Sequence, residues 1–153
     1  MYRIERYRAL CADGRTLDEQ RTLNHHGRWK PTTIVRLEWE CNGRAVQIAH
    51  IYGLMAQLLP DGSGIAILRA SVRSRFSPAL ELIEPDGETR FTLQSPLRID
   101  GKDVVGEFAW FESPQAKTAR TVRMVFWSVA GDRYFLLDVN AETGVITAVM
   151  PLQ

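Results

Sequence analysis

The sequence predicts an all-β protein, an antiparallel meander of about nine to eleven strands with one short N-terminal helix. Three observations lead to this prediction. Short segments rich in Val, Ile, Phe, Trp, Tyr and Thr recur along the chain, and these residues suit a pleated, half-buried surface. Glycine-containing turn sequences separate the segments, and Asn42-Gly43 is the strongest hairpin signal among them. The length of 153 residues fits a single all-β domain spanning residues 1–153.

The N-terminal part is expected to hold an edge strand and the helix. The segment from Tyr2 to Leu10 is rich in charges, which discourage an edge strand from pairing with other chains. Thr16 and Glu19 have the spacing of a capping box, in which Thr16 caps the helix and Glu19 reaches back to it. The sequence therefore predicts a short helix from Thr16 to about Asn24.

A hairpin is expected at Asn42-Gly43, between the segments Ile34–Cys41 and Arg44–Ile51. A two-residue type I′ turn fixes the register of the flanking strands. The expected pairs are Cys41 with Arg44, Trp39 with Val46, Leu37 with Ile48 and Val35 with His50. Cys41 and His50 then lie too far apart for a thiolate–imidazole pair, so His50 is expected to be a hydrogen-bonded core residue.

A strand from Ile65 to Phe76 is expected to carry a candidate anion-binding row. Side chains two residues apart share one face of a strand, which places Arg69, Arg73 and Arg75 together with Ser71. Such a row could hold an anion or an RNA backbone. It could equally be a solvated face paired with the acids just beyond it, which are Glu81, Glu84, Asp86 and Glu88.

The last third of the chain predicts four strands, at Val104–Glu112, Thr121–Val129, Arg133–Val139 and Val145–Met150. Gly131-Asp132 suits a two-residue type II′ turn. That turn would pair Val129 with Tyr134, Trp127 with Leu136, Val125 with Asp138, Phe126 with Leu137 and Met124 with Val139. At the next turn, Ala141 and Glu142 fit the centre of a type I turn, and Gly144 supplies the positive φ that ends it.

These last strands are apolar on both faces, which is unusual for a free antiparallel sheet. Trp127, Tyr134 and Leu136 share the second face, which only Arg123 and Asp138 interrupt. We expect the second face to be covered by another sheet, a neighbouring repeat or a second subunit. Asp138 is expected to pair with Arg123 across the strands; the alternative is a carboxylate of raised pKa.

A weak internal repeat leaves the architecture open. Leu80–Leu97 aligns with Phe135–Leu152 at an offset of about 55 residues, which would give two four-stranded units similar to propeller blades. Other expected elements are Leu54–Leu59, as strand or short helix, and strands at Leu80–Ile83 and Thr89–Leu93. Stacked sheets, blade-like repeats and a barrel are all compatible with this pattern.

Composition excludes several partners. A net charge of +1 gives no strong long-range electrostatic attraction to nucleic acid or to an anionic membrane, so neither is an expected partner. No apolar run approaches the roughly 20 residues of a membrane helix. No signal peptide is visible, and the two cysteines, Cys11 and Cys41, are expected to be reduced thiols of a cytoplasmic protein.

No sequence motif indicates an enzyme. The sequence contains no Gly-x-Ser-x-Gly elbow, metal triad or dinucleotide fingerprint. The adjacent His25 and His26 are expected to be solvated loop residues, because sequence neighbours rarely face one ion. We therefore expect no catalytic residue, metal or cofactor, and an enzyme with an unrecognised site is the least favoured alternative.

The residues Gly27-Arg28-Trp29 resemble the Gly-x-Trp start of lipocalin-like and related calycin barrels, where a short helical turn precedes the motif and a meander follows. The resemblance implies a β-barrel that binds a small apolar ligand, with Trp29, Trp39 and Trp110 near the cavity. Alternatively, Trp29 plugs one end of the core.

The function predicted is a non-catalytic binding protein that uses an apolar-aromatic sheet face. The expected partner is a second copy of the chain, in a homo-oligomer, or another protein. The candidate ligand-binding or partner-binding residues are Trp29, Trp39, Trp110, Trp127 and Tyr134.

Overall fold

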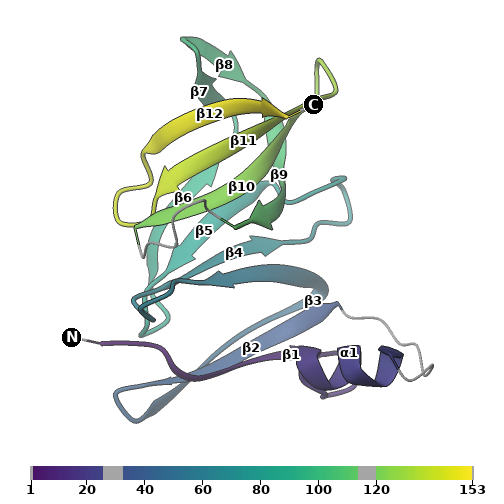
Figure 1. Cartoon of the computed structure of the whole chain (residues 1–153), viewed down its shortest axis with the longest axis vertical. Helices are drawn as coiled ribbons and strands as arrows, with labels where there is room; N and C mark the ends of the chain where they lie inside the picture. Colours follow the sequence, from purple (N-terminus) through teal and green to yellow (C-terminus); the bar gives the residue numbers. More distant parts are fainter. Residues whose placement is uncertain (1, 26–32, 114–119, 153) are drawn as a thin grey trace.

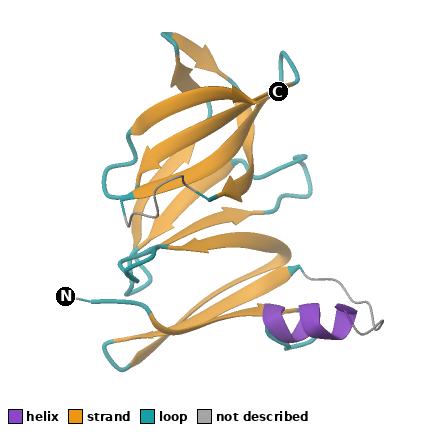
Figure 2. Cartoon of the chain, in the orientation of Figure 1, coloured by secondary structure: helices purple, strands orange, loops and turns teal. Residues whose placement is uncertain are grey.

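Two stacked antiparallel sheets and a small two-stranded ribbon form the protein in the computed structural model, which describes residues 2–25, 33–113 and 120–152 (Figures 1 and 2). The first sheet contains β1 (Glu5–Cys11), β2 (Ile34–Cys41), β3 (Arg44–Leu58), β4 (Ile65–Arg69), β5 (Ala79–Ile83) and β6 (Thr89–Gln94). The second sheet contains β9 (Gly106–Glu112), β10 (Thr121–Ser128), β11 (Arg133–Asn140) and β12 (Ile146–Leu152). The ribbon is β7 (Leu97–Ile99) with β8 (Lys102–Val104), and the helix is α1 (Leu17–His25).

The all-β antiparallel fold with one short helix is confirmed, because within each sheet the spatial neighbours are also chain neighbours. The barrel alternative is wrong, since the sheets do not close on themselves. Two equal four-stranded repeats are also not observed: the sheets hold six, four and two strands. No helix in the described ranges could serve as a membrane span.

Strand β4 is buried on both faces and separates two hydrophobic cores. Ile65 and Ile67 point into one core, which includes residues of β2 and β3 such as Leu37. Ala66 and Leu68 point to the other side, where the four-stranded sheet covers them through residues such as Phe126. Side chains alternate along a strand, so four consecutive apolar residues are needed to fill both cores.

The second core exists because the six-stranded sheet bends sharply within β3. The first part of β3 pairs with β2, and its last part, residues 54–58, pairs with β4. Gly53 lies at this change of partner with φ of +99°, and a Cβ there would collide with the methyl group of Thr33. The bend brings Trp39 of β2 to the β5–β6 turn, where its indole Nε1 donates to the Pro85 carbonyl at 2.6 Å. The predicted elements Arg44–Ile51 and Leu54–Leu59 are therefore one strand.

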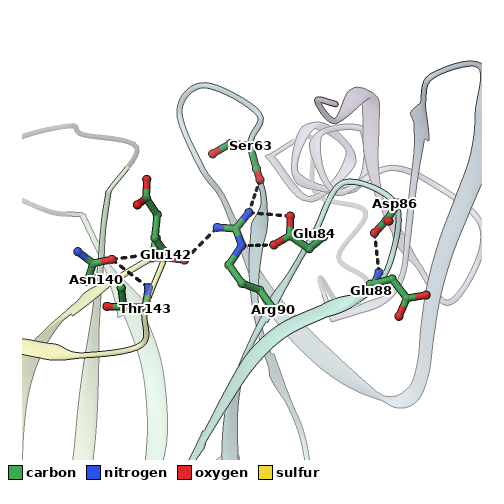
Figure 3. Close-up of polar contacts among 9 residues, drawn as sticks. Ser63, Glu84, Asp86, Glu88, Arg90, Asn140, Glu142 and Thr143 are labelled. Atoms are coloured by element: carbon green, nitrogen blue, oxygen red, sulfur yellow. Dashed lines mark hydrogen bonds and ion pairs between the residues drawn. The ribbon is translucent and has the colours of Figure 1, made fainter. Parts of the chain in front are cut away.

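Arg90 ties the two sheets together at one end (Figure 3). Its guanidinium donates to the carbonyls of Ser63 at 2.6 Å and Ala141 at 2.9 Å, and it forms an ion pair with Glu84 through both carboxylate oxygens. Ala141 belongs to the β11–β12 turn, where Gly144 has the predicted positive φ and its N–H donates to the Asn140 carbonyl at 2.8 Å. This largely buried guanidinium makes four hydrogen bonds that hold the loops together, which indicates a structural role.

The first hairpin confirms the predicted turn at Asn42-Gly43, where both residues have positive φ. The predicted pairs from Cys41–Arg44 to Leu37–Ile48 are observed. The last predicted pair, Val35 with His50, is wrong because a bulge shifts the register between Ile34 and Arg36. The helix start is confirmed as well, since the Glu19 N–H donates to Thr16 Oγ1 at 3.2 Å.

The second hairpin corrects the predicted register by two residues. The loop contains four residues, Val129 to Asp132, so Trp127 pairs with Tyr134 instead of Leu136. The reason is that Asp132, with φ of +46°, takes the left-handed position that the sequence analysis gave to Gly131. A shift of two keeps every side chain on its predicted face.

Replacing Gly53 by alanine is expected to lower the free energy of unfolding by about 1–3 kcal/mol, because alanine adopts this backbone poorly and its Cβ meets Thr33. Urea denaturation measures the change. Gly14→Ala is the control, because Gly14 also has positive φ but has open space around it. Equal losses in the two variants would show that the close approach at the bend does not constrain the fold, and adding Thr33→Ser tests the methyl contact directly.

Candidate functional site: an aromatic cluster beside an open groove

Four aromatic rings gather on the outer face of the four-stranded sheet. Phe76, from the β4–β5 loop, contacts Trp110, Trp127 and Tyr134 edge to face, with ring centroids 6.1, 5.7 and 6.4 Å apart respectively. Trp110 and Tyr134 also approach each other, at 5.9 Å. We refer to these four residues as the aromatic cluster. The sequence predicts Trp110, Trp127 and Tyr134 as binding residues, and the structure brings these three together.

The β4–β5 loop is fixed to the four-stranded sheet by backbone hydrogen bonds. The Ser77 N–H donates to the Phe108 carbonyl at 2.9 Å, and the Phe108 N–H donates to the Ser77 carbonyl at 2.8 Å. The preceding N–H, that of Phe76, donates to Glu107 Oε1 at 3.0 Å. The second face of the sheet is therefore partly covered by a loop of the same chain, whereas a sheet, repeat or subunit was expected.

Carboxylates hold both indoles of the cluster in place. Trp110 Nε1 donates to Glu112 at 2.9 Å, and Trp127 Nε1 donates to Asp132 at 2.7 Å. The Arg75 guanidinium lies 5.1 Å from the centroids of both Phe76 and Trp127. The cluster is half-buried, so fixed ring surfaces stay accessible to a partner. Trp, Tyr and Arg are the residue types that dominate binding energy at protein interfaces, and pre-fixed side chains lose little entropy on binding.

An open groove of about 640 Å³ lies beside the cluster. Phe76, Trp110 and Arg75 line it as well, so the cluster and the groove form one continuous surface. Residues of β3, including Tyr52 and Met55, and residues of α1 line the groove too. Clefts of this size are typical of binding sites.

One of the predicted tryptophans, Trp39, does not belong to this surface. Trp39 is buried in the core between β2 and the β5–β6 turn. Its predicted role in binding has no support from its position. Trp29, together with Gly27, Arg28 and His26, lies outside the described residues.

The predicted arginine row does not exist, because β4 ends at Arg69 and the chain then turns. Arg69 forms an ion pair with Glu81 at 2.6 Å, as the alternative interpretation expected. Arg73 follows Ser71 in the turn, and its N–H donates to Ser71 Oγ at 3.3 Å. Arg75 stacks on the aromatic cluster instead.

Arg123 and Asp138 form the predicted cross-strand pair on the outer face of the sheet. Two hydrogen bonds, at 2.6 and 2.9 Å, join the guanidinium to both carboxylate oxygens. The Asp138 hydrogen bond raises the pKa of Arg123 above its usual value. This pairing gives Asp138 a structural role. Within the described ranges, no three His, Cys, Asp or Glu side chains lie close enough together to hold a metal ion.

The residue that the sequence analysis missed is Phe76. It was placed at the end of a strand, and its cluster partners lie far along the chain. Its position depends on the Ser77–Phe108 pairing, which no local pattern signals.

No protein-family model and no curated protein matches the sequence. One solved structure does match, a chain in "Structure of Tne2 in complex with Tni2". The TM-score is 0.86 at 22% sequence identity, over 98% of this chain and 99% of that chain. The two chains share one fold. At this identity, the likeness establishes the architecture and nothing about activity.

Replacing Asp138 by asparagine is expected to lower the free energy of unfolding by about 3 kcal/mol, because the largely buried Arg123 guanidinium loses its charged partner. Urea denaturation measures the loss. Asp103→Asn is a matched control. Asp103 pairs with Arg98 across β7 and β8, and both side chains are mostly exposed, so the pair contributes below about 1 kcal/mol. Similar small losses in both variants would contradict a structural role for the buried pair.

Proposed function

We propose that this protein is a non-catalytic binding protein that inhibits a partner protein through the aromatic cluster. The observation that carries the proposal is the fixed set of half-exposed rings at Phe76, Trp110, Trp127 and Tyr134, next to an open groove. Such a rigid aromatic surface, stacked with an arginine, has the composition of an interface hot spot.

The comparison with solved structures supports this proposal. The matching chain was solved in a complex of two proteins, Tne2 and Tni2. A chain with the same fold over nearly its whole length is therefore compatible with forming a two-protein complex. We favour inhibitor over adaptor, because an adaptor needs two separate surfaces, whereas the cluster and the groove are continuous.

A second copy of the chain is the alternative partner. The apolar outer face continues past Tyr134 to Met150 and Leu152 on β12, each 39% exposed. These side chains could bury against the same face of another copy in a symmetric dimer. We also propose a cytoplasmic location, because Cys11 and Cys41 are free thiols, as a reducing compartment favours.

Replacing Trp127 or Trp110 by alanine is expected to weaken partner binding by about 2 kcal/mol or more, roughly thirtyfold in Kd, because each substitution removes a fixed aromatic anchor. The partner is captured with the tagged full-length chain from extracts of its native organism and then purified. Titration calorimetry measures the Kd, and the partner's own activity is assayed with and without the chain.

Val145→Ala is the matched control, because Val145 is an exposed apolar residue in the β11–β12 turn, beyond the end of β11 that is distant from Tyr134. Circular dichroism verifies that each variant keeps its β-sheet signal. Equal affinities of the control and both tryptophan variants would refute the role of the cluster. Light scattering on the chain alone decides the alternative: a dimer that Trp127→Ala dissociates would favour self-association over an inhibitor.

A further inference from the structure

The groove beside the aromatic cluster has apolar walls that the bend of β3 creates. Successive side chains along a strand normally point to opposite faces, so Tyr52 and Met55, three residues apart, would lie on different faces of a regular strand. The positive φ of Gly53 turns the chain between them. Both side chains consequently line the groove, opposite Phe76 and Trp110. The His50 ring lies edge to face on Tyr52, at 5.9 Å, and its Nε2 is 2.7 Å from the Ala70 carbonyl, which holds Tyr52 beside the loop.

Exposed apolar side chains also occur next in sequence to residues that line this groove. Ile51 and Val72 are 81% and 72% exposed, the largest values among the large apolar residues of the described chain. Tyr52 and Met55 in the wall are also exposed. Methionine and tyrosine suit adaptable binding surfaces, and an apolar patch continuous with a cluster of fixed rings indicates a place where another chain docks.

The charges in the groove have a single sign. The lining contains two charged residues, Arg21 of α1 and Arg75 of the β4–β5 loop, and no carboxylate among the described residues. Within the same part of the chain, no carboxylate lies within ion-pair distance of Arg21. The nearest carboxylate to Arg75 is that of Asp132, at 4.0 Å, and both side chains are mostly exposed. Such an exposed contact is weak, so both guanidinium groups can pair with a ligand.

We infer that the groove binds a segment of the partner protein in which carboxylate side chains alternate with apolar ones. The inference rests on the proposed function and names the partner chemistry. Apolar side chains of the segment would enter between the β3 wall and the cluster. Its carboxylates would reach Arg21 of α1 and Arg75 of the β4–β5 loop. Arginine suits this role, because its planar group binds carboxylates through two hydrogen bonds.

The test uses the full chain and two fluorescein-labelled peptides, Asp-Phe-Glu-Leu-Asp and Lys-Phe-Lys-Leu-Lys. Fluorescence anisotropy measures their Kd values at matched ionic strength. The acidic peptide is expected to bind at least about tenfold more tightly, because opposite charges attract and like charges repel in the groove. Arg21→Glu and Arg75→Glu are each expected to raise the Kd of the acidic peptide about tenfold. The double reversal is expected to favour the lysine peptide.

Arg44→Glu is the matched control, since Arg44 is exposed at the start of β3, in the hairpin away from the groove. Met55→Asp places a carboxylate in the wall and is expected to exclude the acidic peptide. Equal binding of the two peptides, a preference that survives both reversals, or an equal loss in Arg44→Glu would overturn the inference. Because the peptides report on the groove alone, such a result leaves the proposed role of the aromatic cluster standing.

Discussion

The fold depends on a sheet that bends back on itself at Gly53. Without the bend, β4 would have one face against the four-stranded sheet and the other in water. With it, Ile65 and Ile67 are buried under β2 and β3 while Ala66 and Leu68 stay under the second sheet. Full burial of a large apolar side chain stabilises by about 1.5–3 kcal/mol. The free energy gained by burying the two isoleucines is therefore large enough to offset the cost of a local backbone that only glycine adopts without strain.

The same bend creates the candidate binding surface. It moves the wall that carries Tyr52 and Met55 toward β9, and the β4–β5 loop completes the groove by pairing Ser77 with Phe108. Phe76 then lies over a sheet face that would otherwise expose Trp127 more fully. Core and binding surface thus share one geometric cause, so changes that relax the bend should alter the groove before they unfold the protein.

The sequence predicted what depends on a few adjacent residues. Asn42-Gly43, the Thr16–Glu19 cap and Gly144 each have local turn or cap chemistry that does not need the rest of the chain. The register after Trp127 was wrong because Gly131 and Asp132 both tolerate a left-handed backbone, and only the whole hairpin decides between them. Burial was equally undetermined. Trp39 and Trp127 both lie on predicted strands, yet Trp39 is buried against the β5–β6 turn and Trp127 is half-buried.

A sheet that is apolar on both faces is prone to aggregation. The aromatic cluster combines protection against aggregation with a surface for the proposed partner. Phe76 covers part of the ring surface, and Arg75 adds a charge above it, which opposes unspecific contact between copies. Glu112 and Asp132 bind the indole N–H groups, so a partner need not supply those hydrogen bonds. The surface left for the proposed partner consists of apolar ring faces and the Arg75 guanidinium. Such a surface would select the proposed partner by shape and charge complementarity together.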